Sequence, residues 1–226
     1  MMPSNELFLK TRVEQLISFE NDSAERSVAK SQGEFRHELE SVHDSTSIAR
    51  TMVGNELFAQ NALSCAPQLP GLIMVRPVAG VVRRARLVEV EAYLGPKDLA
   101  SHASKGRTAR TEVMFGPPGR AYVYFIYGMH WMFNVVVGHA GEAEAVLFRA
   151  ALPLDGWAVD LSGPAKLARA CGISRLENGM DLTGDDLYFV REPDYRSRIR
   201  KSKRIGVDYA GRWKDRLLRF VDVQAR

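Results

Sequence analysis

Residues 72–95 read LIMVRPVAGVVRRARLVEVEAYLG, and this stretch decides the fold. Two runs rich in Val, Ile and Leu lie on either side of Gly80, a residue at which the chain turns readily. The pattern predicts two β-strands joined in a hairpin.

Residues 88–93, VEVEAY, place two carboxylates on one face of the second predicted strand. Because side chains alternate along a strand, the apolar and the acidic or aromatic residues are expected on opposite faces, Val88, Val90 and Ala92 against Glu89, Glu91 and Tyr93. A carboxylate at a strand end beside a cleft can deprotonate a water molecule, so Glu91 is a candidate general base. The alternative is that both glutamates are solvated on an exposed sheet face.

More strands follow this hairpin along the chain. Residues 121–138 and 144–152 have the β-branched and aromatic composition of strands, whereas 162–172 predicts a helix that begins near Pro164. Strands that arrive in hairpins with few helices between them indicate an α+β domain around a mostly antiparallel sheet.

The two ends of the chain differ in character. Residues 1–45 are polar and charged, and we expect an N-terminal extension with one or two marginal helices ahead of a domain over 46–226. Residues 47–58 predict a helix running into Gly54, and 203–223 predict a return to strand.

Composition limits the classes of protein. Of the 226 residues, 46% are hydrophobic and 26% charged, which is typical of a globular protein, and the net charge of +4 permits an anionic partner. Cys65 and Cys171 lie far apart outside any CxxC pattern, which favours free thiols and a reducing compartment. With no long apolar stretch, we expect neither export nor a membrane partner, and a cytoplasmic location, at the nucleoid in a bacterium or in the nucleus of a eukaryote.

Two polar residues interrupt apolar strands. Arg149 within EAVLFRAAL needs an anionic partner if it is buried, and Asn134 within WMFNVVV must form a hydrogen bond. Each could be a satisfied structural contact. If they converge with Glu91 on one cleft, they form a base, a cation that keeps it ionised and an amide that filters ligands.

Aromatic residues crowd around a glycine in YVYFIYGMHW, residues 122–131. A tight turn at Gly128, carrying Tyr127 and Met129, could insert between stacked bases, although the same aromatic residues could simply fill the core. The loop 96–120 adds His102 and several cations suited to phosphate contacts, or merely solvated: Lys105, Arg107, Arg110 and Arg120. A second basic run, 196–204, allows the same two interpretations.

Five separated motifs in order resemble the alkyladenine (3-methyladenine) DNA glycosylase family over about residues 46–223. The motifs are VEVEAYLGPKDLASH, MFGPPGRAYVYFIYGMHWMFNVVV, VLFRAALPLDG, SGPAKL and RIGVDYAGRWKDRLLRF. The resemblance implies a single compact domain around a curved antiparallel sheet, similar to the C-terminal domain of methionyl-tRNA formyltransferase, with a β-hairpin that intercalates into DNA.

The resemblance also implies residue roles. Glu91 would activate the attacking water with help from Arg149, and Asn134 would screen against the exocyclic amine of guanine. Tyr93, His102 and Tyr124 would form the base pocket. DNA would be contacted by Tyr127, which fills the place of the flipped nucleotide, and by Met129 and His130 beside it. The basic loop adds Arg107 and Arg110 as expected DNA contacts. His130 stands where some relatives place a tyrosine.

The implied activity is monofunctional base excision: water-mediated hydrolysis of alkylated or deaminated purines from duplex DNA by a monomer, with no metal and no cofactor. Two alternatives come from other classes. One is a non-catalytic nucleic-acid-binding module on the same scaffold. The other is a metal-dependent hydrolase built from Asp98, His102, His130 and His139, whose spacings match no familiar ligand pattern.

Overall fold

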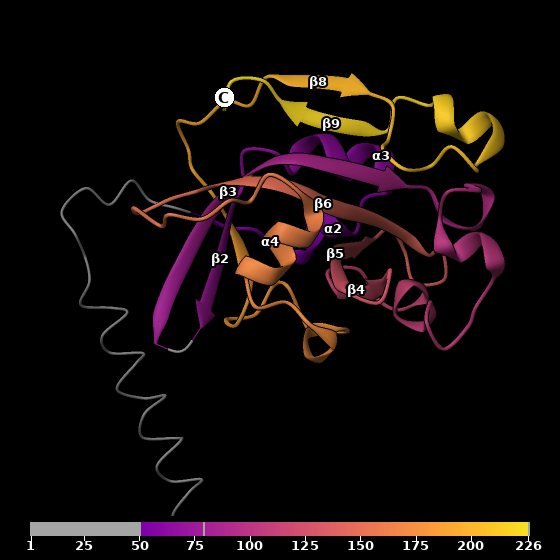
Figure 1. The fold of residues 1–226 in the computed structure, drawn as a ribbon, viewed down its shortest axis with the longest axis horizontal. Coiled ribbons are helices and arrows are strands. Elements are labelled where there is room, and N and C mark those ends of the chain that lie inside the picture. Colours follow the sequence, from indigo (N-terminus) through magenta and orange to yellow (C-terminus); the bar gives the residue numbers. More distant parts are fainter. Residues whose placement is uncertain (1–50, 79, 226) are drawn as a thin grey trace, which may run out of the picture. The chain divides into compact units, whose positions relative to one another are not determined.

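The computed structural model describes residues 51–78 and 80–225, so the expected N-terminal extension, residues 1–45, lies outside the described residues. Within them, the chain forms a mostly antiparallel sheet with few helices, the α+β arrangement that was expected (Figure 1). The sheet order is β1 (Thr51–Met52), β7 (Tyr188–Arg191), β2 (Ile73–Val78), β3 (Val81–Tyr93), β6 (Glu144–Pro153), β5 (His130–Val137) and β4 (Ala121–Ile126). A ribbon of β8 (Ile199–Ser202) and β9 (Arg219–Asp222) is attached to β3. None of the helices among these residues is long and apolar enough to cross a membrane.

The strand β3 (Val81–Tyr93) is the centre of the sheet. Its first half forms the predicted hairpin with β2 (Ile73–Val78), and its second half pairs with β6 (Glu144–Pro153) and with β9 (Arg219–Asp222). The register shifts between Leu87 and Val90, which marks a β-bulge.

The bulge corrects the predicted face of one residue. Val90 and Ala92 join the hydrophobic core as expected, but Leu87 does so in place of Val88, which is only partly buried. An extra residue in the bulge shifts the alternation by one position, so a strict period of two fails there.

The remaining strands complete the two sides of the sheet. The predicted hairpin between 121 and 138 is β4 (Ala121–Ile126) with β5 (His130–Val137). The edge opposite β4 is made by β7 (Tyr188–Arg191) and β1 (Thr51–Met52). The strand β8 (Ile199–Ser202) pairs with β9.

Short helices cover the core face. The predicted helix is α4 (Pro164–Ala170), which packs on β5 and β6 and ends before Gly172 at φ +64°. Two more are α2 (Asn55–Phe58) and α3 (Ala62–Cys65). The prediction of a helix running into Gly54 is wrong for the described residues before that glycine, because Thr51 and Met52 are strand. The helix α2 begins only after Gly54.

The C-terminal segment contains less strand than predicted. Residues 203–218 form turns and a 3₁₀ helix (Gly211–Asp215), and only β9 is extended within 203–223. Cys65 and Cys171 are free, as predicted, and the structure buries both of them.

The two faces of the sheet have different uses. Alternate residues of β4, β5 and β6 pack into the core, among them Val123, Phe133 and Phe148. The intervening residues, such as Tyr124, Asn134 and Arg149, point to a cavity on the other face. Because successive side chains of a strand point to opposite faces, the same strands supply both the hydrophobic core and the polar and aromatic floor of the cavity.

Candidate active site

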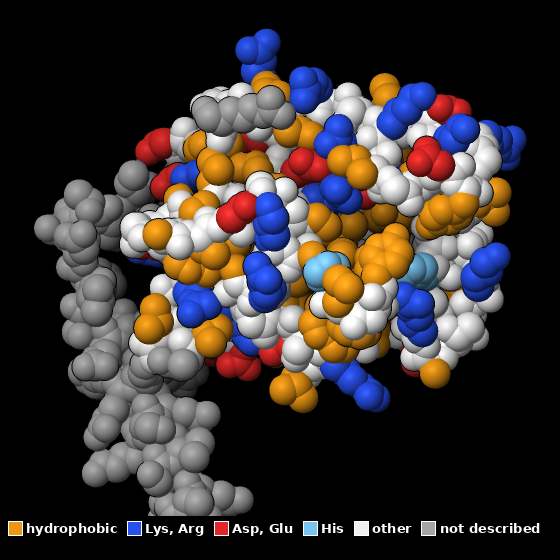
Figure 2. Space-filling view, viewed as in Figure 1, with side chains coloured by type: hydrophobic (Ala, Val, Ile, Leu, Met, Phe, Trp, Pro, Cys, Tyr) orange, Lys and Arg blue, Asp and Glu red, His pale blue; other side chains and the backbone are white. Residues whose placement is uncertain are grey.

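A cavity of about 290 Å³ lies on the sheet face opposite the core. Its walls come from β3 to β6, from the loop 100–114 and from the segment 205–209. Figure 2 shows one face of the molecule, on which Lys and Arg side chains are spread around a group of hydrophobic side chains with histidine beside them. Of the predicted site residues, the described cavity is lined by Tyr93, His102, Arg110, Tyr124, Tyr127, Asn134 and Arg149.

Glu91 lies directly behind this wall. Its side chain is fully buried, and Arg149 Nε lies 3.4 Å from its Oε1. Arg149 is closer to a second carboxylate, since its Nε donates to Glu89 Oε1 at 2.9 Å, and Arg219 Nη1 approaches the same oxygen at 3.1 Å. The structure thus brings Glu91 and Arg149 together within a cluster of two carboxylates and two guanidinium groups.

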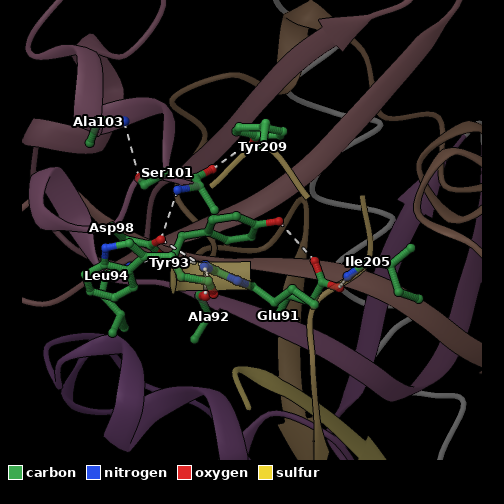
Figure 3. A network of polar contacts seen from close by, with 12 residues as sticks. Glu91, Ala92, Tyr93, Leu94, Asp98, Ser101, Ala103, Ile205 and Tyr209 are labelled. Atoms are coloured by element: carbon green, nitrogen blue, oxygen red, sulfur yellow. Dashed lines mark hydrogen bonds and ion pairs between the residues drawn. The ribbon is translucent and has the colours of Figure 1, made fainter. Parts of the chain in front are cut away.

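Two further donors hold the Glu91 carboxylate. The Ile205 backbone N–H donates to Oε1 at 2.8 Å, and the Tyr93 hydroxyl donates to Oε2 at 3.0 Å (Figure 3). A carboxylate with both oxygens bonded is held in one orientation. Of the residues around Glu91, Tyr93, Arg149 and Ile205 form part of the cavity wall.

Burial raises the pKa of Glu91 above its ordinary value of 4.5, and this effect outweighs the lowering by Arg149, by the Ile205 N–H and by the Tyr93 hydroxyl. Arg149 was expected to keep the carboxylate ionised. The charge of Arg149 acts in the expected direction, but it only partly offsets the loss of water around Glu91.

Aromatic rings form one side of the cavity. The rings of His102 and Tyr124 meet edge to face with centroids 4.5 Å apart, and His102 Nδ1 lies 2.9 Å from the Tyr122 hydroxyl. Burial, together with the nearby charge of Arg110, lowers the pKa of His102 to about 4. This histidine is therefore neutral at pH 7 and presents one N–H donor and one acceptor nitrogen.

Asn134 lies on the cavity floor and is almost fully buried. Its Nδ2 donates to the Tyr122 backbone carbonyl at 2.9 Å, on the facing strand. This bond fixes the amide in the wall, so its position relative to a bound ligand is set by the sheet.

The turn between β4 and β5 is exposed. Met129 N–H donates to the Ile126 carbonyl at 3.1 Å, and both residues between them, Tyr127 and Gly128, have positive φ values of 52° and 67°. Tyr127 is 85% exposed and yet lines the cavity mouth, and Met129 is 67% exposed. An exposed tyrosine in a conformation that favours glycine is unusual and points to a role outside folding. His130, exposed at the start of β5, is not part of the described cavity wall.

The two arginines predicted to contact DNA occupy different places. Arg110 lines the cavity, with its guanidinium 5.2 Å from the centre of the Tyr124 ring. Arg107 is exposed and paired with Glu112 at 2.6 Å, away from the described cavity wall. Only Arg110 is brought to the candidate site.

The residues of the metal-site alternative do not come together. Asp98 is buried in an ion pair with Arg204, with Asp98 Oδ2 2.5 Å from Nη1. Among the described residues, no group of three or more His, Cys, Asp or Glu side chains is placed to hold a metal ion.

Sequence reasoning missed several residues of the site. Ile205 and Tyr209 come from a segment expected to be strand, whereas Glu89, expected on the same face as Glu91, joins the cluster as a second partner of Arg149. Ile205 contributes its backbone N–H, which every residue except proline has. The residue type therefore gives no sign of this role in the sequence. The acidic Asp98 and basic Arg204 were visible, but their pairing across 106 positions was not.

Comparison with known proteins gives one consistent result. The model of the methylpurine-DNA glycosylase family matches residues 56–226. Three bacterial relatives carry the name "Putative 3-methyladenine DNA glycosylase". The protein of Anaeromyxobacter sp. (strain Fw109-5) is 47% identical over 75% of this chain and 88% of its own length. That of Myxococcus xanthus (strain DK1622) is 46% identical over 69% and 82%, and that of Legionella pneumophila (strain Lens) 44% over 72% and 90%.

Proposed function

This chain belongs to the methylpurine-DNA glycosylase family, and from that premise we propose that it is a monofunctional DNA-repair enzyme. Its substrate is duplex DNA that contains an alkylated or deaminated purine. The damaged nucleotide leaves the stack, its base enters the cavity, and hydrolysis of the N-glycosidic bond leaves an abasic site.

The observation that carries this proposal is the position of Glu91 beside Arg149, immediately behind the wall of an aromatic cavity. At about 290 Å³ the cavity is at the small end of ligand pockets, which suits one base rather than an oligonucleotide. The rings of Tyr93 and Tyr124 supply π-faces on which a cationic alkylated purine stacks well.

Recognition of the base combines three groups. The neutral His102 offers a hydrogen-bond donor or acceptor to the purine edge, and Asn134 on the floor excludes the extra amine of guanine. A hydrogen-bonding wall discriminates more sharply than an apolar one, because a wrong substrate leaves buried polar groups unpaired.

The chemical step uses water. The C1′–N bond breaks and its electron pair goes to the departing base, the water oxygen bonds to C1′, and Glu91 accepts the water proton. An ionised Glu91 also stabilises the positive charge that develops on the sugar. Each carboxylate oxygen has two lone pairs, so Glu91 can accept the water proton while the Ile205 N–H and the Tyr93 hydroxyl hold it in place.

DNA is engaged by the exposed turn of the β4–β5 hairpin. Tyr127 takes the space that the flipped nucleotide leaves, and Met129 and His130 press on the adjoining DNA. Arg110 at the cavity edge adds a cation toward the backbone of the flipped nucleotide. A monomer suffices for this arrangement, since all these groups come from one chain.

The test is a base-release assay on duplexes that each carry one methylated purine or one hypoxanthine. The proposal expects free base to appear together with abasic sites, and strand breaks only after alkali treatment. Intact glycosidic bonds in every duplex would contradict the activity, and strand scission before alkali would contradict the monofunctional mechanism.

A further inference from the structure

A buried ion pair lies next to the Glu91 carboxylate. Arg204 and Asp98 are 5% and 0% exposed, and they form a two-pronged contact with Nη1 to Oδ2 at 2.5 Å and Nη2 to Oδ1 at 2.8 Å. Neither of these described residues lines the cavity. The pair therefore acts on a bound ligand only through other residues.

The pair ties separate segments of the chain to one another. Arg204 Nη1 also donates to the Ala92 backbone carbonyl at 2.9 Å, at the end of β3. Asp98 accepts the backbone N–H groups of Leu94 at 3.1 Å and Ala100 at 3.0 Å (Figure 3). The end of β3, the loop after it and the segment that begins at Arg204 are thus fixed at one point.

Both hydrogen bonds to Glu91 come from groups that this pair holds. The Ile205 N–H belongs to the residue after Arg204 and donates to Oε1 of Glu91 at 2.8 Å. The Tyr93 ring lies under the Arg204 guanidinium at 4.7 Å, and its hydroxyl donates to Oε2. Figure 3 shows Tyr93 and Ile205 reaching Glu91 from two sides.

Stability alone is a poor explanation for this pair. Two charges lose their water on burial, and replacement of a buried ion pair by apolar residues of similar volume is often neutral or stabilising. Arg204 Nε is moreover a buried nitrogen without a hydrogen-bond partner among the described residues, which adds to the cost. What the pair does supply is a fixed geometry for its neighbours.

We propose that Arg204 and Asp98 are a positioning pair for the excision reaction. They hold the Ile205 N–H and the Tyr93 ring so that the Glu91 carboxylate is aimed at the sugar of the bound nucleotide. This inference rests on the proposed function, and it assigns neither residue a contact with DNA. Loss of the pair should slow bond cleavage and leave the affinity for damaged DNA unchanged.

The electrostatic surroundings of Glu91 provide a second readout. The charged and titratable groups that face it are Tyr93 on its own strand, Glu89 with its partner Arg219, Arg149 on β6, Tyr124 on β4 and Arg204. The Ile205 hydrogen bond and the charge of Arg204 both lower the pKa of Glu91. If the segment loosens, the pKa of Glu91 rises. The acid limb of the pH–rate profile, which is the pH range where the excision rate falls on acidification, then lies at higher pH than in the wild type.

The experiment compares the full-length wild type with Asp98→Asn and Arg204→Lys. Single-turnover excision rates are measured against pH, on the lesion duplex that the wild type cleaves fastest, and binding to that duplex is measured alongside. We expect a rate loss of about 10–100-fold, the size of effect known for outer partners that orient metal ligands, with binding within about twofold. We also expect the acid limb to move to higher pH.

Glu177→Gln is the matched control. Glu177 is a buried carboxylate paired with Arg76 at 2.9 Å, outside the described cavity wall, so its loss should lower stability and leave the acid limb in place. Because stability itself falls with pH, the folded fraction of each variant is followed by circular dichroism across the pH series, and the rate is expressed per folded protein.

Two outcomes distinguish failure of the positioning role from failure of the proposed function. An active wild type whose Asp98 and Arg204 variants keep its rate and acid limb overturns the positioning role alone. A wild type that releases no purine overturns the proposed function, and this inference with it.

Discussion

Arg149 Nε lies 3.4 Å from Oε1 of Glu91 and only 2.9 Å from Oε1 of Glu89, so one guanidinium serves two carboxylates. Shared in this way, its charge does not cancel the cost of burying Glu91, and the pKa of Glu91 stays raised. The proposed base is therefore partly protonated at a higher pH than an ordinary glutamate.

The first prediction concerns pH. A general base works only when deprotonated, so kcat/KM for excision should fall as the pH drops through the raised pKa of Glu91, with the acid limb above 4.5. Arg149→Gln removes the largest lowering influence, so its limb should lie higher still. A limb at or below 4.5, or one that this change leaves in place, would contradict the assignment.

His102 gives a prediction that needs no substrate. Its ring should titrate with a pKa of about 4 in an NMR pH series, against 6.5 for an ordinary histidine. Because the unfolded chain takes up this proton first, the free energy of unfolding should decrease as the pH falls from 6.5 toward 4.

Arg110→Gln should raise the pKa of His102, since that arginine disfavours its protonated form. Arg107→Gln, in the same loop but paired with Glu112, is the control and should leave it unchanged. A wild-type His102 that titrates near 6.5 would refute the neutral-histidine role.

Tyr127 should matter for capture of the flipped nucleotide and little for folding. Tyr127→Ala should weaken binding of lesion DNA by about 1–3 kcal/mol, the range for loss of a base-stacking ring, with hardly any change in melting temperature because the side chain is 85% exposed. At φ 52°, Tyr127→Gly should be more stable than Tyr127→Ala by about 1–2 kcal/mol. Lesion binding by the alanine variant equal to that of wild type would rule out the wedge.

Asn134→Ser should relax discrimination against guanine. The shorter side chain removes bulk from the cavity floor, so release of guanine from undamaged duplex should rise relative to release of hypoxanthine. Asn178→Ser is the control, because Asn178 accepts the Val123 N–H from outside the described cavity wall. The gatekeeper role fails if the two variants show the same ratio of released bases.

The fold followed from the sequence where patterns are local. Alternation and turn residues were enough for the β2–β3 hairpin, the β4–β5 hairpin and α4. Local patterns failed at the bulge before Val90, where one extra residue changes the faces, and in 203–218, where turns replace the expected strand.

The site was predictable in its residue types and less so in its arrangement. Arg149 and Asn134 stood out because polar groups in apolar strands need partners, and Glu91 because it is a carboxylate at a strand end. In the structure Arg149 and Asn134 line one cavity, and Glu91 lies beside Arg149 behind its wall. The Ile205 N–H and the Asp98–Arg204 pair depend on contacts across more than 100 positions, which no periodicity records.

The most direct test of the central claim is the single-turnover excision rate of Glu91→Gln on a lesion duplex, with Glu177→Gln as the control for loss of a buried carboxylate. Glutamine keeps the size of the side chain but cannot accept the water proton. We predict a rate lower by about 10²–10⁴-fold with lesion binding retained, and a control rate close to wild type. A Glu91→Gln variant that excises as fast as wild type would contradict the account.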